Sequence, residues 1–152
     1  MLIRLAVALV LGAVLGIERE IVGKEAGVRT EMLVAAGASI FAMIGLALPY
    51  ITAANFGTLP DAAGANSAFG IIANIVIGIG FLGAGLIIHN GDHARGITTA
   101  ALVWTTAAIG ILAGLGLYEF AVTSTLIITV LLYLLRALRV SEHVDSRIEN
   151  GK

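Results

Sequence analysis

Residues 69–89 read FGIIANIVIGIGFLGAGLIIH, and this stretch decides the fold. It is long enough to cross a bilayer, which takes about 20 apolar residues in a helix. Its GIGFLGAG segment also matches the Gly-x-Gly-x-x-Gly fingerprint of dinucleotide-binding loops. Such a loop needs an acid about 20 residues later to hold the ribose, and the sequence ITTAALVWTT at 97–106 contains none. The stretch therefore predicts a membrane helix and not a cofactor loop.

Four further apolar stretches cover residues 2–17, 32–54, 97–116 and 119–138. The whole chain is 59% hydrophobic and only 12% charged, whereas soluble domains carry about a quarter charged residues. We expect an all-α polytopic membrane protein with five transmembrane helices. Residues 1–140 form the membrane domain and residues 141–152 a short cytoplasmic tail. The absence of cysteine excludes disulfides, thiol nucleophiles and thiolate metal sites.

Lysine and arginine are distributed asymmetrically between the connections. With five spans, the segments 18–31 and 90–96 and the C-terminal end share one side and hold every basic residue except Arg4. The positive-inside rule then predicts an outer N-terminus and an inner C-terminus, in a bacterial inner membrane. The sequence NFGTLPDAAGANS at 55–67 predicts an irregular outer connection.

The first and second halves of the chain resemble each other. A shift of 69 positions places Gly16 on Gly85, Gly27 on Gly96 and Thr30 on Thr99. Each half reads as a helix, a short basic inner loop and a second helix. We therefore expect a parallel internal repeat, an arrangement known from transporters.

Small residues recur at helical spacing in three spans. Because lipid provides little hydrophobic drive between helices, close contact through small residues favours their association. We expect the helix with GIGFLGAG to pack against several neighbours at the centre of the bundle; the alternative is an unwound helix that offers carbonyls to an ion. The candidate packing residues are Gly12, Gly16, Gly78, Gly80, Gly83, Gly85, Gly110 and Gly114.

Two polar connections are candidates for ion binding. The segment from Glu18 to Glu31 holds four glutamates, which suit Mg²⁺, but three basic residues among them favour a salt-bridged loop at the membrane surface. His89, Asp92 and His93 have metal-ligand spacing only on a helix, and the turn signal Asn90-Gly91 disfavours one.

Threonines mark the fourth apolar stretch. We expect Thr98 and Thr99 to cap its helix, and Thr105 and Thr106, beside Trp104, to bond across helices or to their own backbone. No charge lies in the middle of a span, and Asn74 is the strongly polar side chain that we expect to be buried, which argues against a proton-coupled transporter. No nucleophile–base pair is visible, so we expect no enzyme.

Two ordered motifs carry a resemblance to a known family. The runs LGAVLGIERE…AGVRT and GIGFLGAG…RGITTAALVWTTAAIG resemble the MgtC/SapB family of bacterial inner-membrane proteins over residues 5 to 135. The resemblance implies a link to low-magnesium adaptation and, in intracellular pathogens, to survival in macrophages. It also implies a modulator of other membrane complexes, the F-type ATP synthase among them.

The resemblance places important residues in the second motif, and the inner loops add others. The candidate ion- or partner-binding residues are Glu18, Arg19, Glu20, Arg29, Thr30, Asn74, Arg95, Thr98, Thr99, Trp104 and Thr105. This sequence departs from the family at Ser67, where an aspartate is usual, and it resembles the short SapB-like members that have no soluble C-terminal domain.

Two functions follow as expectations. The first is a modulator that binds other membrane proteins through its small-residue faces. The alternative is a homo-oligomeric transporter or channel subunit for Mg²⁺ or another cation. The expected partners are the lipid bilayer, other membrane proteins and further copies of the chain, with no nucleic acid and no cofactor apart from Mg²⁺ as the candidate ion.

Overall fold

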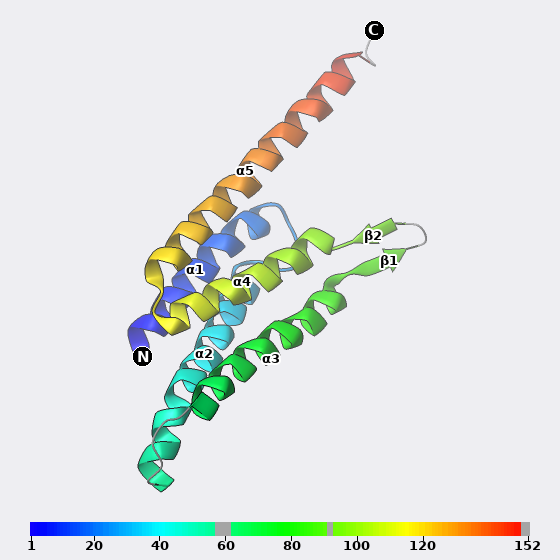
Figure 1. The fold of residues 1–152 in the computed structure, drawn as a ribbon. Coiled ribbons are helices and arrows are strands. Elements are labelled where there is room, and N and C mark those ends of the chain that lie inside the picture. The colour runs from blue at the N-terminus through cyan, green and yellow to red at the C-terminus, as the bar shows by residue number, and fades with distance from the viewer. Residues whose placement is uncertain (57–61, 91–92, 150–152) are drawn as a thin grey trace.

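The computed structural model describes residues 1–56, 62–90 and 93–149. Within these ranges the chain forms five helices, α1 (Leu2–Ile21), α2 (Val28–Phe56), α3 (Ala62–Leu86), α4 (Ile97–Leu115) and α5 (Tyr118–Glu149) (Figure 1). Two short strands, β1 (Ile88–Asn90) and β2 (His93–Arg95), pair antiparallel between α3 and α4. The helices α2 to α5 each contain a segment that is long and apolar enough to cross a membrane. The prediction of an all-α polytopic membrane fold is confirmed, while the orientation and the repeat stay predictions.

The helices extend beyond the predicted apolar stretches. Helix α2 begins at Val28 instead of residue 32, and α5 continues to Glu149, through most of the predicted tail. Helix α3 begins at Ala62, within the connection that we expected to be irregular, of which residues 57–61 lie outside the described residues. The reason is that hydropathy marks where lipid surrounds a helix, whereas backbone hydrogen bonding continues through polar residues at its ends.

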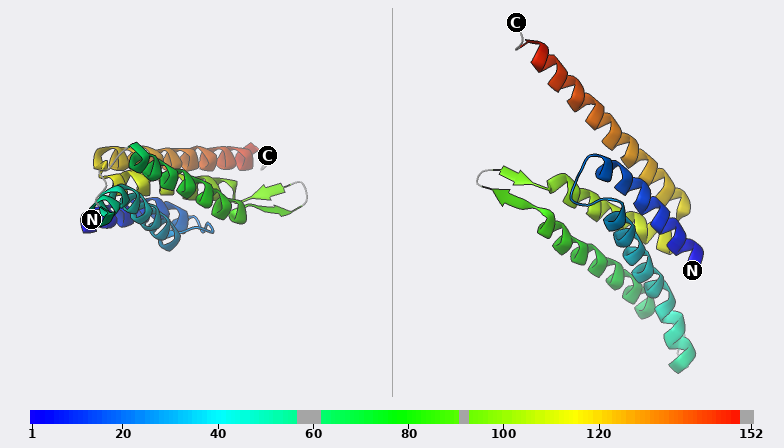
Figure 2. Two further views of the ribbon diagram at one scale, coloured as in Figure 1. Left: turned by 60° about the horizontal axis from the view of Figure 1, so that its bottom comes forward. Right: turned by 180° about the vertical axis from the view of Figure 1, so that it is seen from behind.

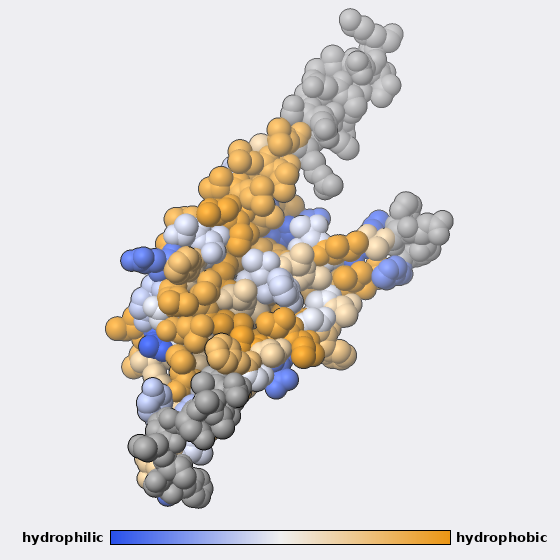
Figure 3. Space-filling view, in the orientation of Figure 1, coloured by the Kyte–Doolittle hydropathy of each residue, from blue (hydrophilic) through white to orange (hydrophobic). Residues whose placement is uncertain are grey.

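Helix α4 lies at the centre of the bundle. It contacts α1, α2, α3 and α5, whereas α3 packs mainly on α2 and α4, and α5 on α1 and α4. Seen from behind, α1 and α4 lie between α3 and α5 (Figure 2, right). One apolar cluster joins α1, α4 and α5 around Leu15 and Ile109, and a second joins α2, α3 and α4 around Ala38 and Ile111. Figure 3 shows that apolar side chains also cover much of the visible surface, as lipid contact requires.

Four of the predicted packing glycines lie where α2 meets its neighbours. A Cβ added at Gly12 of α1 would lie 2.6 Å from the carbonyl oxygen of Glu31, and one at Gly114 of α4 would lie 2.5 Å from that of Ser39. Gly16 faces Val28 and Gly110 faces Ala35 in the same way. No larger residue fits at such distances, so these glycines permit the backbones to touch.

The glycines of α3 do not share this role, which corrects the expectation that GIGFLGAG lies at the bundle centre. Gly83 alone approaches another helix, 3.7 Å from the Cβ of Ala100 when a Cβ is added. Around Gly78, Gly80 and Gly85 no described atom would lie within 4 Å of such a Cβ. Helix α3 packs mainly on α2 and α4 and therefore lies on a flank of the bundle. Gly85 also differs here from its repeat counterpart Gly16, which packs tightly.

Candidate functional site

A buried arginine joins three parts of the chain at the end of α1. Arg19 is only 5% exposed, and its Nη2 donates to Oγ1 of Thr99 on α4 at 2.9 Å. The Thr99 hydroxyl in turn donates to Oε2 of Glu25, in the loop between α1 and α2, at 3.1 Å. Glu18 Oε2 lies 3.8 Å from Arg19 Nη1. Since a buried cation requires such partners, this network fixes α1, α4 and the loop relative to one another.

The network changes the titration of the exposed Glu25. A hydrogen bond between the carboxylate and the backbone of Glu25 itself, together with the hydrogen bond from Thr99, holds the pKa of the Glu25 carboxyl below its ordinary value. The positive charges of Lys24 and Arg19 lower this pKa further. Glu25 is therefore ionised at neutral pH and remains a steady hydrogen-bond acceptor for Thr99.

Glu20 has a separate role in the same loop. Its Oε2 accepts a hydrogen bond of 2.8 Å from the backbone amide of Val28, the first residue of α2. A carboxylate is favourable here because a helix N-terminus carries partial positive charge. Gly27 leaves room for it, since an added Cβ would lie 2.7 Å from Glu20 Oε2. The predicted salt-bridged loop is thus a capping and tethering segment with one ion pair among the described residues.

Glu31 is fully buried at the start of α2, a burial that was not predicted because residues 18–31 were assigned to a connection. Neither carboxylate oxygen has a hydrogen-bond partner within the described part of the chain, and the same holds for the hydroxyl of Thr106 on α4 and for Arg19 Nε. The physical reason is that α2 starts four residues before the predicted span, which brings Glu31 into the helix interface. A signal existed in the sequence, because Glu31, Ala35, Ala38 and Ala42 share one helical face.

The predicted threonine caps are also wrong. Gly96 occupies the N-cap of α4 with φ 84°, and its carbonyl accepts from the amide of Ala100 at 2.8 Å. Thr99 is used by Arg19 instead, and Thr98 is exposed. Thr105 bonds to its own backbone, donating to the Ala101 carbonyl at 2.8 Å, as one of the two alternatives stated.

Other predicted site residues lie apart from this network. Trp104 is 50% exposed on the outer side of α4, and Arg95 is exposed in β2. In the hairpin His89 pairs with Ala94, whereas Asp92 and the side chain of His93 lie outside what the structure describes. Within the described ranges no three His, Asp or Glu side chains gather as metal ligands.

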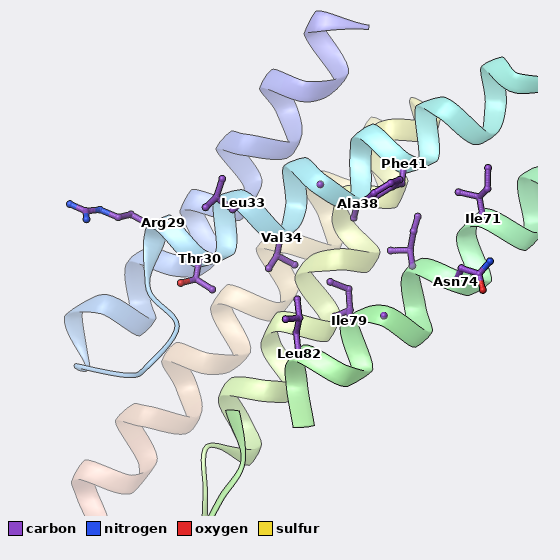
Figure 4. A pocket seen from close by; sticks show the side chains of 13 residues that line it. Arg29, Thr30, Leu33, Val34, Ala38, Phe41, Ile71, Asn74, Ile79 and Leu82 are labelled. Atoms are coloured by element: carbon purple, nitrogen blue, oxygen red, sulfur yellow. The ribbon is translucent and has the colours of Figure 1, made fainter. Parts of the chain in front are cut away.

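A groove of about 700 Å³ separates α2 from α3 and contains three more of the predicted residues. Arg29 and Thr30 lie at one end of it and Asn74 lies near the other, with apolar side chains such as Leu33, Val34 and Ile79 between them (Figure 4). Asn74 is exposed, so the expectation that it is buried inside the bundle is wrong. The cause is again the position of α3 on the flank.

Comparisons with known proteins match most of the chain. A family profile described as the MgtC family matches residues 5–140. Protein MgtC of Salmonella typhimurium strain LT2 is 42% identical over 135 residues, which are 89% of this chain and 52% of that protein. Protein MgtC of Brucella abortus strain 2308 is 41% identical over 134 residues, 88% of this chain and 50% of the relative. The chain thus spans about half the length of these relatives. No solved structure matches it.

Proposed function

Because this chain belongs to the MgtC family, we propose that it is a membrane protein of low-magnesium adaptation that modulates other membrane complexes by binding their transmembrane helices. An F-type ATP synthase is one partner that the family resemblance implies. The magnesium link rests on that resemblance and on the name of the relatives.

The observation that carries the binding role is the outward face of α3. Gly80 and Ala84 lie on this face beside Ile77, which is 72% exposed, and Phe81, which is 81% exposed, borders it. A glycine inside a helix costs about 0.5–1 kcal/mol relative to alanine. In α1 and α4 the close helix contacts offset this cost, but no described atom lies near a Cβ added at Gly80. A helix from another protein would supply the missing contact.

Substitution of Gly80 by leucine tests this role. Leucine fills the outward face without a clash inside the chain, because the site is open. Affinity purification of the tagged protein at native expression is expected to recover its membrane partners with the wild-type chain and to lose them with Gly80→Leu. Gly85→Leu is the matched control, since it makes the same change at an open site on another face of α3. Equal recovery from the wild type and both variants would refute the role of this face.

The buried carboxylate of Glu31 favours a second candidate, a subunit of an oligomeric transporter or channel for Mg²⁺ or another cation. Among the described residues the buried charged side chains are Glu18, Arg19 and Glu31, so acids outnumber bases in this interior. Polar groups buried in a membrane often mark an ion path. Purified protein in liposomes tests this candidate, which requires a cation flux that Glu31→Gln reduces; no flux beside a working control transporter rules it out.

A further inference from the structure

The groove between α2 and α3 is apolar along most of its length and polar at one end. Leu33, which is 71% exposed, and Phe41, which is 54% exposed, line its open side, and Ile71 and Leu82 line it from α3. These side chains face outward from the bundle, so membrane components reach the groove directly. The partner face around Gly80 lies on the other side of α3 and is not part of this lining.

The length of the groove matches one leaflet of a bilayer. Its lining on α2 runs from Arg29 to Phe41 and stops there, although α2 continues to Phe56. At 1.5 Å per residue this distance is about 18 Å. Half of a hydrocarbon core is roughly 15 Å. A transmembrane helix crosses both leaflets, whereas an acyl chain occupies one, so the extent of the groove favours a lipid.

Arg29 supplies charge at the end where an acyl chain meets its headgroup. The side chain is exposed, and Figure 4 shows it extending beyond the end of the groove, away from the apolar lining. Within the described ranges no carboxylate lies within ion-pair distance of its guanidinium. This end adjoins the loop 22–27, on the side that the basic residues predict to be cytoplasmic. Basic pockets between transmembrane helices on that side suit anionic lipid headgroups.

We propose that this groove binds an anionic phospholipid of the inner leaflet, with an acyl chain along the apolar wall and the phosphate on Arg29. Gly37 and Gly78 leave the space for the chain, since no described atom would lie within 4 Å of a Cβ at either position. The lipid lies on the side of α3 opposite the partner face, so its binding does not depend on the proposed partner.

Native mass spectrometry of the full chain in detergent tests the proposal, with phosphatidylglycerol and phosphatidylethanolamine added in equal amounts. The wild-type protein retains phosphatidylglycerol preferentially. Arg29→Gln lowers this preference about fivefold, the effect of one basic residue near a membrane surface. Gly78→Leu fills the groove and reduces retention of both lipids, while leucine is a better helix former than glycine, so the fold tolerates it.

Two control variants make the result specific. Arg136→Gln removes an exposed arginine of α5 that does not line the groove, and Gly80→Leu adds leucine to the opposite side of α3. Both retain the wild-type preference. The proposal is overturned if the wild type shows no preference for phosphatidylglycerol, or if Arg29→Gln and Arg136→Gln behave alike. It is also overturned if Gly78→Leu instead dissociates an oligomer without changing lipid retention, since the groove would then hold a helix.

Discussion

Replacement of Thr99 by valine tests whether the Arg19 network holds the helices together. Valine has nearly the same shape as threonine, so the change removes the hydroxyl and leaves no large cavity. The hydroxyl accepts from Arg19 Nη2 at 2.9 Å and donates to Glu25 Oε2 at 3.1 Å. Loss of a hydrogen bond to a charged group costs about 1.5–3 kcal/mol. Because Thr99 is 1% exposed, water cannot replace the hydroxyl, and we expect the free energy of unfolding to fall by about 2 kcal/mol.

The assay is equilibrium unfolding in mixed micelles with increasing SDS, followed by helix content. Thr98→Val is the matched control, because Thr98 is adjacent in sequence but its side chain is exposed. We expect it to change the free energy of unfolding by less than about 0.5 kcal/mol. A double-mutant cycle of Arg19→Met and Thr99→Val is expected to give a coupling of about 1 kcal/mol or more. Equal stability of the Thr98 and Thr99 variants, or additive effects in the cycle, would refute the network as a stabilising element.

Three other predictions concern packing, pH and orientation. Gly110→Leu places a side chain against the backbone of Ala35 and is expected to destabilise the fold by more than about 3 kcal/mol. Gly78→Leu, at an open site, is expected to leave the midpoint of SDS unfolding unchanged or to raise it. Similar unfolding midpoints for the two variants would contradict this. Since the folded-state pKa of Glu25 is lowered, its contribution to stability is present above the ordinary carboxyl pKa and disappears as the pH falls through the lowered value. Glu25→Gln is therefore expected to reduce the loss of unfolding free energy at acidic pH. The same loss in the wild type and the variant would argue against this role. The chain has no cysteine, so a single cysteine at Lys24 reports orientation, and an impermeant thiol reagent is expected to label it only from the cytoplasmic side of inner-membrane vesicles.

The sequence predicted the type of fold because long apolar stretches in a chain with few charges allow few alternatives. It predicted less about the helix ends. The stretch from Val28 to Glu31 is polar and was assigned to a loop, although Glu20 caps it and it forms the first turn of α2. The burial of Glu31 was missed for the same reason. The hairpin of β1 and β2 was signalled only by the turn at Asn90-Gly91.

The function of the glycines was predicted unevenly, and the reason is physical. A glycine stripe shows that a close approach is permitted, but it does not show which helix approaches. At Gly12 and Gly114 the neighbour is α2 of the same chain, whereas at Gly80 no described atom approaches. Likewise Thr99 was selected as a candidate site residue, but its hydrogen-bond partner Arg19 is 80 residues away and only the fold brings the two together.

Site-specific photo-crosslinking from position 81 tests the central claim that the outward face of α3 binds another membrane protein. A photoreactive residue replaces Phe81, which is 81% exposed on this face, and a control replaces Leu126 of α5, which is 57% exposed. At native expression we expect position 81 to give one defined adduct with a different membrane protein, and we expect Gly80→Leu to abolish it. Adducts that form equally from both positions, that consist only of lipid or of a second copy of this chain, or that persist with Gly80→Leu would contradict the claim.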